Sequence, residues 1–141
     1  LDISQSALNV AAENALLNAA NVQFLNYNIL SDSSETLPTN LDVIVSNPPY
    51  IRELERSLMQ PNVLNFEPEM ALFVPDEDPL LFYRAIVRHG RQLLKPGSMI
   101  FFEINEALSI EVSQLLKESA YSEIVIKNDI FGKPRMIKAI K

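Results

Sequence analysis

The chain has 141 residues, a length typical of one domain, and its 48% hydrophobic and 21% charged residues are typical of a globular protein. It contains no cysteine, which excludes disulfides and thiolate metal sites. A formal net charge of −6 argues against a broad surface for binding phosphate backbones, and it leaves open a local basic patch near the C-terminus.

No apolar stretch is long enough to span a membrane and no signal peptide is visible, so a cytoplasmic location is predicted. The single histidine, His89, is expected to be structural or solvated, and no metal site is predicted. The three glycines lie at positions 90, 97 and 132, so the first half cannot contain a glycine-rich nucleotide-binding turn.

The first half predicts one helix and two strands. Residues 5–20 carry apolar side chains at helical spacing, with Ser4 as a plausible N-cap. Residues 22–26 are predicted to be a short strand and residues 27–40 a polar, turn-like segment. The apolar run 41–46 then predicts a buried strand.

The second half predicts an alternation of helices and strands. A long connection over 51–78 is expected to include a helical part around 53–59, and Asp78-Pro79 is predicted to begin the next helix. Further predicted elements are a helix end at 95–98, a strand at 99–104, a helix at 107–119 and strands at 121–127 and 135–140. This order predicts an α/β fold with a mostly parallel sheet that ends in an antiparallel hairpin.

Asn47-Pro48-Pro49-Tyr50 follows the strand predicted at 41–46, where open α/β sheets bind their ligands. The Asn47 side-chain oxygen and the Pro48 carbonyl can each accept one N–H of a planar amide or amine. The Tyr50 ring can stack on that flat group. Two acceptors would favour the charge that develops on an attacking nitrogen. The alternative is an ordinary proline-rich turn.

These residues resemble a family. The Asn-Pro-Pro-Tyr motif and the terminal hairpin resemble the Rossmann-like class I S-adenosylmethionine-dependent methyltransferases. Phe66-Glu67-Pro68, Phe102-Glu103-Ile104 and the segment 129–135 resemble the protein-(glutamine-N5) methyltransferases that modify release factors, the HemK family. The resemblance covers essentially residues 1–141 as a partial catalytic domain.

The resemblance implies roles for particular residues. Asn47, Pro48, Pro49 and Tyr50 would be catalytic, with Asn47, Pro48 and Tyr50 also binding substrate. Asp2, Asn28 and Asn47 would bind the cofactor S-adenosylmethionine, although Asp2 could instead cap the first helix and Asn28 could be a turn residue.

Other residues have two interpretations. Phe66 and Glu67 would shape the substrate pocket, or Phe66 would simply anchor a long loop in the core. Glu103 is expected to be structural, Arg135 is expected to pair with Asp129, and Asn105 stands where the family often has glycine.

The family's first strand and its glycine-rich cofactor loop would lie before Leu1 and are missing from this chain. The strands at 22–26 and 41–46 are therefore expected to expose unpaired edges, through which the chain could self-associate. A fragment of this kind is expected to bind cofactor weakly.

The predicted function is methylation of the glutamine amide in the Gly-Gly-Gln tripeptide of a peptide-chain release factor. One alternative is a nucleic-acid amino-methyltransferase acting on adenine N6 or guanine N2, which the acidic composition and the Phe-Glu-Pro segment disfavour. The other is an inactive binding module. Neither a membrane nor a nucleic-acid partner is expected.

Overall fold

The computed structural model describes residues 1–141, which form two compact units, Leu1–Asp32 and Ser33–Lys141. The first unit contains helix α1, Gln5–Leu17. Ser4 is its N-cap and accepts a hydrogen bond from the Ala7 backbone N–H. The helix and its cap confirm the prediction for this region, although the helix ends at residue 17 rather than 20.

The strand predicted at 22–26 is wrong as a regular strand. A single parallel bridge joins Asn26 to Asp2, with hydrogen bonds from Asp2 N to the Leu25 carbonyl and from Tyr27 N to the Asp2 carbonyl. A strand needs a partner strand that pairs with it over several residues. In this unit, Asp2 is the one residue whose main chain forms a bridge with the segment 22–26.

The second unit is built on a four-stranded mixed sheet with the order β1-β4-β6-β5. β1 (Leu41–Ser46) pairs in parallel with β4 (Leu94–Glu103), and β6 (Pro134–Ile140) pairs antiparallel with both β4 and β5 (Ser122–Asn128). The α/β class and the C-terminal antiparallel hairpin are confirmed. The prediction of a mostly parallel sheet is wrong, because β1–β4 is the one parallel pair of this sheet and the pairs β4–β6 and β5–β6 are antiparallel. β1 is an edge strand, and its predicted burial is wrong too, since alternate side chains face outward and Val43 and Val45 are 42% and 76% exposed.

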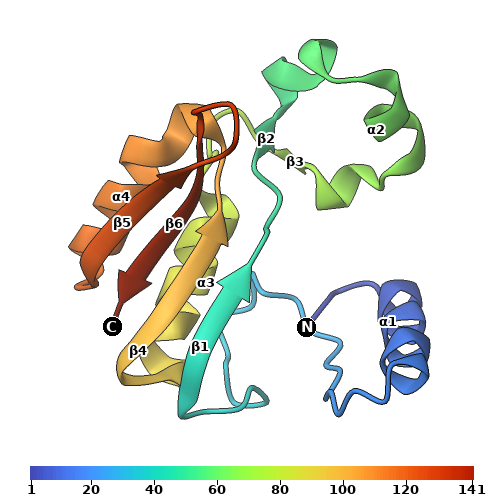
Figure 1. Ribbon diagram of the computed structural model, residues 1–141, viewed down its shortest axis with the longest axis vertical. Coiled ribbons are helices and arrows are strands. Elements are labelled where there is room, and N and C mark those ends of the chain that lie inside the picture. The colour runs from blue at the N-terminus through green and yellow to red at the C-terminus, as the bar shows by residue number, and fades with distance from the viewer. The chain divides into compact units, whose positions relative to one another are not determined.

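Helices α3 (Leu81–Leu93) and α4 (Ser109–Glu118) lie against the same face of this sheet (Figure 1). A short 3₁₀ turn, η3 (Glu106–Leu108), precedes α4. The core between helices and sheet consists of alternate strand residues and the apolar helix stripes: Tyr83, Val87, Ile100, Phe102, Val112, Leu116 and Ile137.

Helix α3 begins at Leu81, whereas the sequence predicted that it would begin at Asp78-Pro79. The residues before it form a turn in which the Asp78 carbonyl accepts from Leu81 N. The helix also ends earlier, because residues 94–98 belong to the beginning of β4, where Gly97 has a φ of +80°.

The long connection between β1 and α3 contains five short elements. They are β2 (Ile51–Arg52), the 3₁₀ helix η1 (Glu53–Leu58), α2 (Pro61–Phe66), η2 (Glu69–Ala71) and β3 (Phe73–Val74). β2 and β3 form a separate parallel pair. The helical part predicted around 53–59 is confirmed as a 3₁₀ helix. The helix α2 was not predicted, although it begins at Pro61 and proline suits the first helical position.

Gly90 is required by close packing against Tyr121. A Cβ at position 90 would lie 2.4 Å from the Tyr121 hydroxyl, which donates to the Val87 carbonyl. We expect Gly90→Ala to destabilise the chain by about 1 kcal/mol net, since the clash outweighs the gain in helix propensity. In a Tyr121→Phe background the same change should be neutral or stabilising. Urea unfolding of wild type, Gly90→Ala, Tyr121→Phe and the double variant measures the coupling energy between the two positions. An equal effect of Gly90→Ala in both backgrounds would contradict the proposed clash.

Candidate active site at the carboxyl end of β1

The Asn-Pro-Pro-Tyr motif begins immediately after β1, beside the carboxyl end of β4, where Ser46 is paired with Phe102. The Asn47 side chain is exposed, Pro48 is buried, and Pro49 and Tyr50 are half-buried. The structure therefore fixes the motif's proline backbone at the edge where α/β sheets bind ligands, with an amide group directed to solvent.

Tyr50 is held at both ends by β4 and the residues that follow it. Its hydroxyl donates to Glu103 Oε1 at 2.6 Å, and its backbone carbonyl accepts from Asn105 Nδ2 at 3.2 Å. The Tyr83 hydroxyl donates to the Glu103 backbone carbonyl at 3.0 Å and so supports the same strand end. Glu103 thus orients the tyrosine ring, in agreement with the structural role predicted for it.

The environment keeps the Tyr50 phenol protonated. Burial, followed by the hydrogen bond to Glu103 and its negative charge, raises the pKa of Tyr50 to about 12. A protonated phenol is the form that can donate to the carboxylate, so this bond persists through the physiological range.

Alkaline pH should destabilise the fold through its buried tyrosines. Burial also raises the pKa of Tyr121 to about 12 and raises that of Tyr83. Because these folded-state pKa values exceed the unfolded value near 10, their contribution is fully present below pH ~10 and is lost as the pH rises toward about 12. Thermal unfolding between pH 9 and 12 should show a falling midpoint, with a smaller fall in Tyr50→Phe. An identical slope in that variant would exclude Tyr50 as a contributor.

Asn105 and Glu55 are site residues whose contacts the sequence did not reveal. Asn105 Nδ2 donates to Glu55 Oε2 at 3.0 Å as well as to the Tyr50 carbonyl, and Glu55 also accepts from Arg52. The one available signal was a polar residue at position 105, where the resemblance leads one to expect glycine.

Phe66 and Glu67 lie at the end of α2, within the connection that leads away from the motif. The Phe66 side chain is 83% exposed, and Glu67 is exposed too. The interpretation of Phe66 as a core anchor is therefore wrong, since no core covers it. A role of both residues toward a substrate stays a prediction.

Asp2 and Asn28 belong to the first unit, in which the main chain of Asp2 bonds to Leu25 and Tyr27, next to Asn28. Asp2 Oδ1 accepts from Ser4 N, and Asn28 Oδ1 accepts from Leu30 N in a local turn. Asn28 is thus a turn residue, as its alternative interpretation expects. The alternative for Asp2 is wrong, because Ser4 is the N-cap of α1 and Asp2 accepts from the N–H of Ser4 itself. The cofactor roles of both residues stay predictions.

The hairpin residues behave as predicted. Arg135 Nε lies 3.7 Å from Asp129 Oδ2, and Asp129 Oδ1 accepts from the backbone of Phe131 and Lys133 across the turn. These bonds fix the β5–β6 turn.

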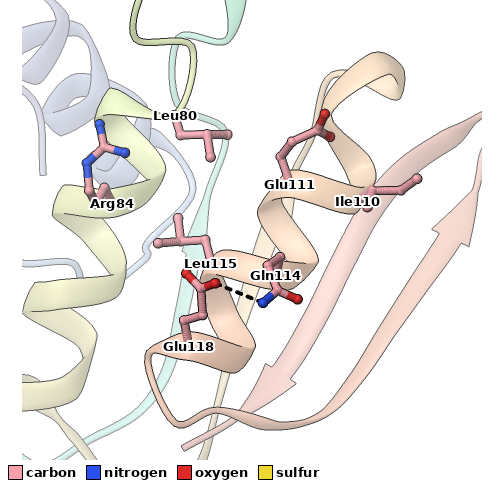
Figure 2. Close-up of a pocket in the computed structure, with 7 residues that line it drawn as sticks. All are labelled: Leu80, Arg84, Ile110, Glu111, Gln114, Leu115 and Glu118. Atoms are coloured by element: carbon pink, nitrogen blue, oxygen red, sulfur yellow. Dashed lines mark hydrogen bonds between the residues drawn. The ribbon is translucent and has the colours of Figure 1, made fainter.

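No group of three or more histidine and acidic side chains is arranged to hold a metal, and no helix is long and apolar enough to cross a membrane. A shallow pocket lies between α3 and α4 (Figure 2), and none of the motif residues lines it. Its lining residues are Leu80, Arg84, Ile110, Glu111, Gln114, Leu115 and Glu118.

Comparison with solved structures identifies the fold. A methyltransferase from Pyrococcus furiosus matches 98% of this chain and 59% of its own length, with a TM-score of 0.65 and 17% identity. TrmN from Thermus thermophilus matches 99% of this chain and 34% of its own, with a TM-score of 0.58 and 18% identity. The fold is that of a class I methyltransferase domain, and residues 1–64 match the family model of the methyltransferase small domain.

Sequence comparison identifies the family within that class. The release factor glutamine methyltransferase of Bacteroides thetaiotaomicron is 45% identical over 98% of this chain and 49% of its own length. That of Flavobacterium psychrophilum is 44% identical over 98% and 48%. The chain belongs to the family of the release factor glutamine methyltransferases, and it spans about half the length of these relatives.

Proposed function

We propose that the protein carrying this chain transfers a methyl group from S-adenosylmethionine to the side-chain amide nitrogen of a glutamine in a peptide-chain release factor. The observation that carries this proposal is the Asn-Pro-Pro-Tyr motif at the carboxyl end of β1, with Tyr50 held by Glu103 and Asn105. The names of relatives 44–45% identical to this chain support the substrate.

The motif residues supply positioning and acceptors. The Asn47 oxygen and the Pro48 carbonyl would accept the two N–H groups of the glutamine amide, which orients its nitrogen lone pair. The same acceptors stabilise the positive charge that develops on nitrogen. Tyr50, whose ring is oriented through Glu103, would pack against the flat amide.

The cofactor supplies the electrophilic methyl group when it is bound. Two exposed side chains have the chemistry to hold it: the carboxylate of Asp2 would accept from the ribose hydroxyls, and the amide oxygen of Asn28 would accept from the adenine amino group. Asn47 would contact both the cofactor and the substrate. A substrate that acts in translation also agrees with the predicted cytoplasmic location.

The experiment is a methyl-transfer assay with the complete gene product that carries this chain, radiolabelled S-adenosylmethionine and a purified release factor. Peptide mass spectrometry should place the methyl on the glutamine of Gly-Gly-Gln, and a release factor with alanine at that position should stay unlabelled. Labelling of DNA or RNA added instead would favour the nucleic-acid alternative. Cofactor binding without transfer to any of these would favour the binding module.

A further inference from the structure

A buried asparagine links the motif to the segment that follows it. Asn105 is 7% exposed and lies just beyond the carboxyl end of β4. Its Nδ2 donates to the Tyr50 carbonyl at 3.2 Å and to Glu55 Oε2 at 3.0 Å, and its Oδ1 accepts from Ala107 N at 3.0 Å. Both donors and the acceptor of this amide are therefore used by three different segments.

The Glu55 side of this link is charged. Burial alone would raise the pKa of Glu55, but hydrogen bonds from the Arg52 side chain and backbone, and the one from Asn105, lower it below its usual value. Glu55 is therefore a carboxylate at neutral pH, and the Asn105 amide donates to a charged acceptor, which makes a stronger bond than a neutral one.

The link has a geometric consequence for the motif. Tyr50 is its last residue, and Glu55 lies in η1 on the path toward Phe66 and Glu67. Asn105 is hydrogen-bonded to both Tyr50 and Glu55. While both bonds persist, the distance between the motif and the beginning of the connection is therefore fixed. A glycine at position 105 would leave both the Tyr50 carbonyl and Glu55 without this donor.

We propose that Asn105 is a positioning residue for methyl transfer, which fixes the motif against the β2–η1 segment through Tyr50 and Glu55. This inference rests on the proposed function. Since Asn105 acts through Tyr50, its loss should lower turnover and leave cofactor affinity unchanged. Misplacing reacting groups by about 1 Å can cost on the order of 100-fold in rate.

The decisive variant is Asn105→Asp in the complete gene product. It places a second carboxyl against Glu55, and two carboxylates at hydrogen-bond distance cannot both ionise without a large penalty. At low pH the shared proton restores a donor toward Glu55, whereas at higher pH repulsion opens the link. The charged and titratable groups that face this point are Arg52, Glu55, Tyr50, Glu103 and Arg135, with Asp76 and Glu111 acting on Arg52.

The measurement is kcat, KM for the release factor and cofactor Kd for wild type, Asn105→Asp and Asn105→Ala, from pH 5.5 to 8.5. The exposed Asn128→Ala on β5 is the matched control and should equal wild type. We expect kcat to fall about 10- to 100-fold in Asn105→Ala with cofactor Kd within about twofold of wild type. The activity of Asn105→Asp relative to wild type should rise as the pH falls.

A pH-independent ratio for Asn105→Asp, or a loss that lies in cofactor Kd, would overturn the inference. If Asn105→Ala does not fold, the pH dependence of Asn105→Asp still decides the question. Failure of the proposed function is a separate result, because the wild-type protein would then show no methylation of the release factor at any pH.

Discussion

Replacing Asn47 with alanine should lower kcat for glutamine methylation by about 100- to 1000-fold, the usual cost of removing one preorganised polar group that stabilises developing charge. Asn47 is exposed immediately after β1, so the substitution leaves the core unchanged. The change should weaken cofactor binding far less than it lowers turnover, since in the proposed function the amide oxygen accepts from the reacting amide nitrogen.

The assay uses the complete gene product, with kcat from methyl transfer to the release factor and cofactor Kd from calorimetry. Asn62→Ala, at an exposed position in α2, provides a matched control and should retain wild-type values. Equal losses in turnover and in cofactor affinity would contradict the assigned role, because they would make Asn47 a cofactor-binding residue alone.

Replacing Phe102 with alanine should have the largest effect on stability, about 3–5 kcal/mol. Phe102 is 2% exposed in β4, and its ring meets that of Tyr83 edge-on, with centroids 5.3 Å apart and an interplanar angle of 87°. The substitution removes this aromatic pair and leaves a cavity between the sheet and α3.

Urea unfolding of the 141-residue chain measures this loss. Phe102→Leu, which conserves more volume, should cost less, and Phe131→Ala, at a hairpin position 81% exposed, should stay within about 0.5 kcal/mol of wild type. A similar loss for the Phe102 and Phe131 alanine variants would show that burial in β4 does not determine stability.

The elements that the sequence predicted well are those with local signals. The strand 41–46, the helix beginning at Gln5 and the hairpin follow from apolar periodicity and turn residues, which need no knowledge of distant partners. The segment 22–26 failed because a strand also depends on the main chain that it meets. The exposure of Phe66 was likewise not predictable, since burial depends on what else packs nearby.

In the candidate site, too, the part with a local sequence signal was predicted and the part that depends on distant residues was not. The motif is contiguous in sequence and could be recognised at once, together with the acceptors that it offers. The groups that orient it are 53 and 55 residues away from Tyr50, on Glu103 and Asn105, and no local pattern connects them. Only the pairing of β1 with β4 brings these residues together.

The edge position of β1 has a consequence for the motions of the site. Because β1 is bonded to β4 alone, every second residue directs its main-chain groups away from the sheet, and those amides should exchange with deuterium rapidly. The strand that presents Asn47 is thus held by half of the ladder that an interior strand has. In the 141-residue chain, the two hydrogen bonds to Tyr50 are therefore additional restraints on the segment that follows β1, beyond the one ladder that β1 shares with β4.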